Sequence, residues 1–331
     1  MKRLLQIDLL KALAITSVVV THSLTADQLR TASVFTIEQA VPVFFLVMAF
    51  SAKQSFDRTS SAASLGEIYR SGYLPRRFKR LLGPLFVAVV LSVALGVLRG
   101  APLYFGPRTL LLYWPVPLRG QFFITITILF VAFAPVLYAA YRRAPEFTVL
   151  GCVAADVAFE AVASHVPVFA HTYYLYQIVP LRFAALFALG MWLTDDAHPW
   201  SRRNWFIYPS AVASIVFLLV YGLGFRTAFV GIEHMYNVLA FGYPLLLVAA
   251  GLTWLHAQSG SPVLNALGEI GKASWHIFLV QGVWLGSAIS ILPAGRVQWV
   301  CVNVVICCGV GYAWYRLGEE LRERRLLRGS K

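Results

Sequence analysis

Residues 81–98 of the chain read LLGPLFVAVVLSVALGVL, an apolar run with no charged side chain. A run of this length is typical of a helix that crosses a lipid bilayer, because about 20 residues at about 1.5 Å each span the hydrocarbon core. A spanning helix also satisfies its own backbone hydrogen bonds, which water cannot do inside the membrane. The stretch therefore predicts a membrane protein built from helices.

Nine more apolar runs lie before and after this stretch, and their length favours helices over strands. They fall at about residues 8–26, 35–52, 120–140, 147–163, 177–194, 205–224, 235–256, 273–292 and 298–317. Ten spans use about 200 residues and leave about 130 for loops and ends. We therefore predict an all-α, polytopic membrane bundle of about ten transmembrane helices.

The composition agrees with this class. Of the residues, 59% are apolar and 13% are charged, against about 45–50% and about 25% in soluble domains. Intrinsic disorder is excluded, because the apolar content is high and 14% of the residues are aromatic. No internal repeat, low-complexity tract or Gly/Ser linker is present, so we expect a single transmembrane domain over residues 1–331 that ends in a short basic cytoplasmic tail at 318–331.

The formal net charge of +13 would suggest nucleic acid as a partner if the protein were soluble. In membrane proteins, however, basic residues gather on the cytoplasmic side of the spans. With the N-terminus inside, 20 of the 28 Lys and Arg residues lie on the cytoplasmic side and six lie outside. This asymmetry predicts that both termini are cytoplasmic and that the number of spans is even. The lipid bilayer then explains the charge, and no nucleic-acid partner is expected.

The first apolar run carries three ionisable side chains on one helical face. Lys11 and His22 are eleven residues apart, and eleven steps of about 100° come within about 20° of whole turns. Asp8 lies one turn before Lys11. Because a charge in hydrocarbon costs several kcal/mol, this stripe should face the protein interior or a water-filled space.

Two interpretations of the stripe are open. In the structural one, Asp8 and Lys11 neutralise each other and His22 is a hydrogen-bonded core residue. In the functional one, His22 is a general base, since the ordinary pKa of histidine lies near neutrality and the side chain can take a proton from an attacking hydroxyl.

The predicted cytoplasmic loop before residue 81 is strongly basic, with five basic side chains and no acidic one in residues 70–80. Arg76, Arg77 and Arg80 share one face if the following helix begins early, and arginine binds phosphate in a bidentate manner. The cluster is therefore either an anchor on anionic lipid or a site for a polyanionic phosphate compound. No glycine-rich phosphate loop is present, so ATP is not expected.

Together these two elements resemble the membrane acyltransferase-3 family. The first helix of that family carries Arg or Lys, ten residues and then His, often in an Ile-Asp-x-Leu-Arg/Lys context. The chain matches this pattern with Ile7, Asp8, Leu10, Lys11 and His22. The family's first cytoplasmic loop carries Arg-Arg-x-x-Arg, which is matched by Arg76, Arg77 and Arg80.

Weaker elements of the resemblance lie further along the chain. Residues 41–47, 121–123 and 271–277 are similar to segments of the family's second, fourth and a late helix. The chain departs from the pattern after residue 47, where Ala49-Phe50 replaces the usual Ser-Gly, and at Gln281, where the family often has His.

The resemblance implies an integral membrane O-acyltransferase that moves an acyl group, usually acetyl, from cytoplasmic acyl-CoA to a hydroxyl of an envelope or exported glycan. Acetyl-CoA or another acyl-CoA is then the donor, a carbohydrate or glycolipid is the acceptor, and the bacterial cytoplasmic (inner) membrane is the location. We expect His22 to deprotonate the acceptor or relay the acyl group, Lys11 to position the donor and Asp8 to orient Lys11. The CoA phosphates would be held by Arg76, Arg77 and Arg80.

Three further ionisable residues are candidates for substrate binding. Glu160 and Arg182 lie in neighbouring predicted helices, where a buried ion pair is the default expectation and a substrate-lining role is the alternative. Glu38 is expected either to orient His22 or to be an exposed interfacial carboxylate. The histidines show no metal-ligand spacing such as His-Glu-x-x-His, so no metal is expected.

Two other classes of protein fit a polytopic chain. A secondary transporter of a small molecule or glycolipid should show repeats, or helices broken by Gly or Pro at matched positions, and the sequence shows no such pair. A membrane scaffold needs no stripe from Lys11 to His22. The acyltransferase is therefore the preferred prediction and the transporter is the alternative, while formation of a homo-oligomer is left open.

Overall fold

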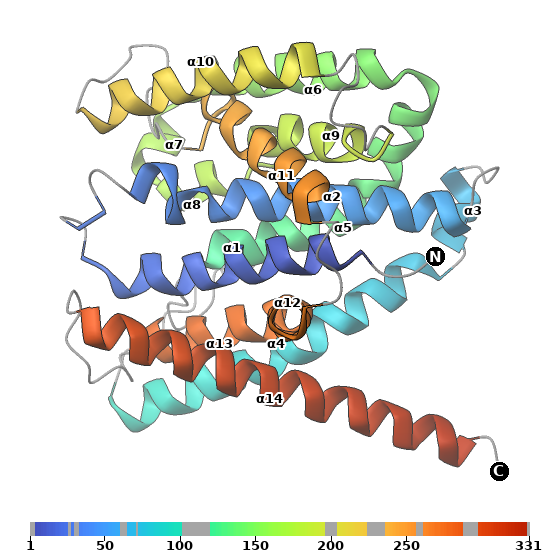
Figure 1. The fold of residues 1–331 in the computed structure, drawn as a ribbon, viewed down its shortest axis with the longest axis vertical. Coiled ribbons are helices and arrows are strands. Elements are labelled where there is room, and N and C mark those ends of the chain that lie inside the picture. The colour runs from blue at the N-terminus through green and yellow to red at the C-terminus, as the bar shows by residue number, and fades with distance from the viewer. Residues whose placement is uncertain are drawn as a thin grey trace. The chain divides into compact units, whose positions relative to one another are not determined.

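The computed structural model describes residues 4–25, 28–29, 33–59, 65–70, 72–100, 120–195, 204–223, 236–255, 261–286 and 297–329. Within these ranges every regular element is an α-helix or a short 3₁₀-helix, and none is a strand (Figure 1). The all-α prediction is therefore confirmed.

Each of the ten predicted apolar runs overlaps one of ten helices of the described chain. These helices are α1 (Leu5–Ser23), α2 (Ala40–Thr59), α4 (Tyr73–Leu98), α5 (Gln121–Arg143), α6 (Pro145–Ala163), α9 (Ala184–Trp192), α10 (Asn204–Gly222), α11 (Gly242–Trp254), α13 (Ser274–Gly286) and α14 (Val297–Gly329). Further helices lie between them along the chain, namely α3 (Leu65–Arg70), α7 (Pro167–His171), α8 (Tyr173–Gln177) and α12 (Pro262–Lys272). The 3₁₀-helices are η1 (Ser33–Phe35), η2 (Ile37–Gln39), η4 (Pro180–Phe183) and η5 (Val238–Ala240).

Six segments of the described chain are long and apolar enough to cross a membrane: Leu5–Ser23, Ser33–Arg58, Tyr73–Leu98, Gln121–Arg143, Asn204–Gly222 and Val297–Arg324. In α4, α10 and α14, only 22% of the most apolar window is buried. Large apolar side chains such as Phe86, Trp205 and Val305 are exposed there, which suits lipid and not water as their surroundings. The protein is thus a polytopic membrane protein, and the count of ten spans and the cytoplasmic termini stay predictions.

The chain packs into two compact units. Unit 1 comprises residues 1–29, 81–121 and 258–331, and therefore holds α1, α12, α13, α14 and most of α4. Unit 2 comprises residues 30–80 and 122–257, and holds α2, α3, α5 to α11 and the first turns of α4.

In unit 1, α1 packs along α12, α13 and α14, and α13 packs along α14. Glycines make these close approaches possible. A Cβ at Gly271 of α12 would overlap the backbone carbonyl of Asp8, and one at Gly311 of α14 would overlap Ile277 of α13. Small residues at helix crossings let backbones touch, which is the usual basis of helix association inside membranes.

In unit 2, close approaches at glycines likewise bring α9 against α2 and α11 against α10. A Cβ at Gly190 of α9 would overlap the carbonyl of Leu46 and the side chain of Ala49, so the alanine at the position of a departure from the family pattern lies at a helix crossing. Aromatic rings fill the adjacent core. The ring centroids of Phe45 and Phe183 are 4.7 Å apart.

Candidate functional site

The ionisable stripe of α1 faces the interior of unit 1. Asp8 is 1% exposed, and Lys11 and His22 are half-buried, whereas Leu13 on the opposite side of the helix is 62% exposed. Asp8 also lies where α12 touches α1, because Gly271 meets its backbone carbonyl. The orientation predicted from the eleven-residue spacing is therefore confirmed.

His22 lies in the last turn of α1 beside a tight turn of the chain. Gly120 has a φ of +81°, a left-handed conformation that favours glycine. A Cβ at Gly120 would lie 3.0 Å from the ring of Phe278 and 3.6 Å from Nε2 of His22. A side chain at position 120 would therefore come close to both of these rings.

A hydrogen-bonded chain holds the end of α1 that carries His22. Trp284 Nε1 of α13 donates to Asn303 Oδ1 of α14 at 2.9 Å. Asn303 Nδ2 in turn donates to Ser23 Oγ at 3.1 Å, and Ser23 donates to the carbonyl of Val19 at 2.7 Å. Ser23, the residue after His22, is thus bonded to α14 and, through Asn303, is linked to α13.

The basic cluster of unit 2 lies at the start of α4. This helix begins at Tyr73, eight residues before the apolar run, so Arg76, Arg77 and Arg80 are helical, as their predicted shared face requires. Arg76 and Arg80 are exposed and Arg77 is half-buried. Two of the three arginine side chains therefore lie at the surface of unit 2.

Arg77 is positioned by a stack of aromatic rings. Its guanidinium carbon lies 5.7 Å from the ring centroid of Tyr73. The ring of Phe56 in α2 lies 4.8 Å from Tyr73 and 4.9 Å from Tyr138 of α5. Tyr138 donates a hydrogen bond of 2.7 Å to Asp57. The stack thus connects the first turn of α4 to α2 and α5.

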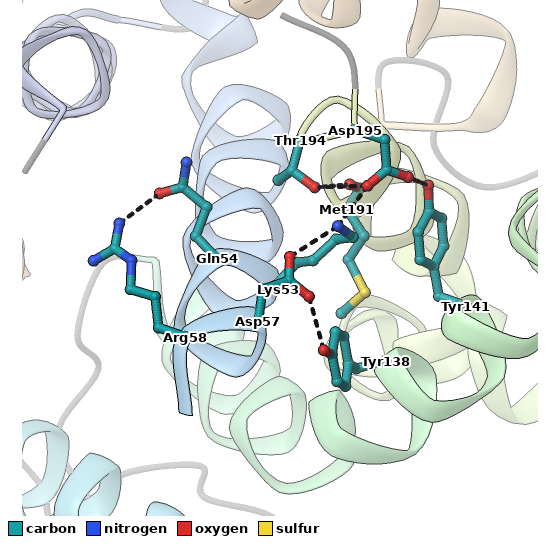
Figure 2. A network of polar contacts seen from close by, with 9 residues as sticks. All are labelled: Lys53, Gln54, Asp57, Arg58, Tyr138, Tyr141, Met191, Thr194 and Asp195. Carbon is teal, nitrogen blue, oxygen red and sulfur yellow. Dashed lines mark hydrogen bonds and ion pairs between the residues drawn. The ribbon is translucent and has the colours of Figure 1, made fainter. Parts of the chain in front are cut away.

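Figure 2 shows the polar network at the other end of this stack, in which Lys53 of α2 lies between two carboxylates. Lys53 Nζ is 3.0 Å from Asp57 Oδ2 and also pairs with Asp195 Oδ1. Tyr141 of α5 donates to Asp195. The Lys53 side chain is 9% exposed, so its charge needs these partners.

Lys53 is one of the 20 basic residues predicted to lie on the cytoplasmic side, and no role in a site was predicted for it. Its pairing with Asp57 follows the four-residue spacing of a helix and could have been found from the sequence. Its pairing with Asp195 joins positions 142 residues apart and left no local signal.

The α3 segment is tied to α5 by Tyr69, whose hydroxyl donates to the carbonyl of Ala132 at 2.8 Å. Burial raises the pKa of Tyr69 above its usual value, which keeps the phenol protonated and able to donate. Because Tyr69 lies four residues before Tyr73, this bond anchors the basic segment at a second point.

Glu160 and Arg182 form the ion pair that the sequence suggested. Arg182 Nε lies 3.3 Å from Glu160 Oε1, and Arg182 is 0% exposed. Tyr176 donates to both carboxylate oxygens of Glu160, at 2.9 and 2.7 Å. Arg182 also donates to the carbonyl of Tyr236 at 2.9 Å and lies 4.2 Å from the ring centroid of Tyr176. These contacts fit a structural ion pair, and a role in substrate binding stays a prediction.

Glu38 is buried and accepts a hydrogen bond of 2.9 Å from Ser33. The expectation of an exposed interfacial carboxylate is therefore wrong: Glu38 lies in η2, is 5% exposed and meets Ser33 of η1. Its role in orienting His22 stays a prediction.

Among the described residues, no group of three His, Cys, Asp or Glu side chains could hold a metal ion.

Comparison with protein families gives one match. The model of a family described as an acyltransferase domain, acyltransferase-3, matches residues 4–315 of the chain. This range includes the α1 stripe and the arginines of α4. Comparisons with curated proteins and with solved structures found no match.

Proposed function

The chain belongs to the membrane acyltransferase-3 family, and we propose that it transfers an acyl group, most simply acetyl, from cytoplasmic acyl-CoA to a hydroxyl of an envelope or exported glycan. The single observation that carries this proposal is the family match over residues 4–315, which includes both ionisable elements. The bacterial cytoplasmic membrane is the proposed location, since such a protein meets acyl-CoA on one face and an envelope glycan on the other.

The donor side of the proposal rests on the arginines of α4. Acyl-CoA carries about four negative charges near neutral pH, so it is attracted to a cluster of guanidinium groups. Arg76 and Arg80 are exposed and Arg77 is held by Tyr73, an arrangement that suits bidentate contacts with phosphate oxygens. A lipid anchor would need the charges but not the aromatic stack and the Lys53 network behind Arg77.

The transfer side of the proposal rests on the α1 stripe. His22 takes the proton of the acceptor hydroxyl as the hydroxyl oxygen attacks the thioester carbon, and Lys11 positions the donor with Asp8 as its orienting carboxylate. Three facts support these roles: the stripe faces inward, Nε2 of His22 lies near Gly120, and Ser23 is bonded to α14 and linked through it to α13.

Mass spectrometry of envelope glycans tests the proposal. We expect an acyl substituent on a glycan hydroxyl in cells that express the wild-type protein, and its loss in cells that lack the gene. His22→Ala at equal protein abundance should abolish the substituent, whereas His165→Ala, which changes an exposed histidine, should keep it.

Two outcomes would count against the proposal. Full acylation with His22→Ala would show that His22 is not the base. Export of the glycan or another solute without any covalent change would assign the chain to the transporter class instead.

A further inference from the structure

Two buried glutamine side chains of unit 1 leave amide atoms without a hydrogen bond. Gln281 of α13 is 0% exposed, and neither its Nε2 nor its Oε1 has a partner in the described part of the chain. Gln121, directly after Gly120, is also buried, and its Oε1 finds no partner among the described residues. A buried amide that makes no hydrogen bond lowers stability, so it calls for an explanation.

Gln281 lies on α13 between two residues, Phe278 and Trp284, whose contacts lead to the end of α1. Phe278, Gln281 and Trp284 follow one another at three-residue steps and therefore project from neighbouring positions on one side of the helix. Phe278 lies against Gly120, as does Nε2 of His22. Trp284 reaches Ser23 through Asn303. On α13, Gln281 thus lies between Phe278, which meets the same glycine as His22, and Trp284, which is linked to Ser23.

The contrast with Asn303 shows that this part of the fold can satisfy a buried amide. Asn303 is buried, and both its Oδ1 and its Nδ2 are used, by Trp284 and Ser23. Gln281 lies one turn from Trp284 and makes no such bonds. We therefore expect the hydrogen-bonding groups of the Gln281 amide to be used by a bound ligand and not by the fold.

We propose that Gln281 binds the substrate, with its Nε2 donating a hydrogen bond to the carbonyl oxygen of the acyl group that is transferred at His22. The inference rests on the proposed function and extends it. An acyl carbonyl accepts hydrogen bonds and donates none, so it needs the N–H that Gln281 offers. The unused Oε1 of Gln121 suits the complementary partner, a hydroxyl of the acceptor.

In the transfer step, this N–H donor would stabilise the negative charge that develops on the carbonyl oxygen. His22 takes the proton as the acceptor oxygen forms a bond to the thioester carbon, and the carbonyl electron pair moves onto oxygen. Gln281 stabilises that oxyanion. The intermediate then collapses, the carbon–sulfur bond breaks, and the thiolate of CoA takes the proton from His22. A fixed donor aimed at the developing charge is the usual source of rate enhancement in acyl transfer.

The test compares variants for rate and for stability. Membrane vesicles that contain each variant receive labelled acetyl-CoA, and label in the envelope glycan gives kcat and KM. Gln281→Met, which keeps the volume without the amide, should lower kcat about 100-fold and change KM for acetyl-CoA little. Gln281→Glu keeps acceptor oxygens but loses the N–H, so kcat should fall as well.

Thermal unfolding of the purified proteins gives the second readout. Gln281→Met should raise the melting temperature, because it removes an unsatisfied buried amide. Asn303→Leu is the matched control: it removes a satisfied amide and should lower the melting temperature.

Three results separate the possible failures. A normal kcat for Gln281→Met beside an inactive His22→Ala would overturn the inference and leave the proposed function intact. A melting temperature that falls as far as in Asn303→Leu would give Gln281 a structural role and also overturn the inference. Absence of label transfer by the wild-type protein would instead refute the proposed function.

Discussion

Replacing Glu160 by alanine decides between a structural and a substrate-binding role for the buried pair of unit 2. The change removes one ionic contact of 3.3 Å to Arg182 and the acceptor of the hydrogen bond that the Tyr176 hydroxyl shares between two carboxylate oxygens. Arg182 is 0% exposed, so its charge would stay buried without its carboxylate. Such a change destabilises proteins by about 3–5 kcal/mol, and we expect a loss of that size in the free energy of unfolding.

Denaturant unfolding in mixed micelles measures this loss, with acyl transfer followed in parallel. Glu160→Gln keeps the volume and one oxygen for Tyr176, so its loss should be smaller, about 1–3 kcal/mol. Glu146→Ala is the matched control, because Glu146 is an exposed carboxylate in the same helix. Its effect should stay within about 0.5 kcal/mol.

The two roles predict opposite outcomes for Glu160→Ala. If the pair is structural, stability falls and the transfer activity of the remaining folded protein stays close to that of the wild type. A protein that unfolds like the wild type but no longer acylates its acceptor would refute the structural reasoning and make Glu160 a substrate-binding residue.

Three further predictions concern the donor region and the packing of α1. Arg77→Ala should raise the KM for acyl-CoA about tenfold by removing one charged contact to phosphate, and an unchanged KM would return the cluster to a lipid-anchor role. Lys53→Met removes the cation between Asp57 and Asp195, so it should lower the free energy of unfolding by about 1–3 kcal/mol. The loss is limited to this range because Asp57 is 44% exposed and solvent screens part of its repulsion with Asp195. Wild-type stability in a denaturant titration would contradict this. Gly271→Ala should destabilise by about 1–3 kcal/mol through overlap with the carbonyl of Asp8, and an unshifted melting curve would refute the close approach.

The apolar runs predicted the helices well, because the length of a run and its lack of charge are local properties. The run at 81–98 corresponds to α4, but the helix begins at Tyr73. Its first turns are rich in arginine, which has good helix propensity and low hydropathy, so a hydropathy pattern does not detect them. The start of a helix outside the apolar run is therefore the part of the boundary that such a pattern misses.

The run at 177–194 shows the opposite error. It contains the end of α8, the 3₁₀-helix Pro180–Phe183 and α9, instead of one continuous helix. Pro180 removes a backbone donor, and Arg182 is held by Glu160 and by the carbonyl of Tyr236, so the chain is drawn away from helical geometry. The proline was a visible signal for this break, whereas the contacts of Arg182 were not.

Contacts between distant parts of the chain were predictable only in part. The stripe of α1 followed from helical periodicity, and the pairing of Glu160 with Arg182 followed from the scarcity of charge in neighbouring spans. The approach of Gly271 to Asp8 joins positions 263 residues apart, and the pairing of Lys53 with Asp195 has no periodic signal either. Packing of side chains in three dimensions sets these contacts, and a single sequence does not record it.

Burial alone does not separate function from structure in this protein. Lys53 and Arg182 are buried charges, and each lies beside a carboxylate of its own unit that neutralises its charge. Gln281 is equally buried but uncharged, and the described residues leave both of its amide atoms without partners. A buried group that the fold satisfies stabilises the fold, whereas one that the fold leaves unsatisfied gains its free energy only when a ligand arrives. We therefore expect Gln281, and not Lys53 or Arg182, to contact the substrate of this acyltransferase.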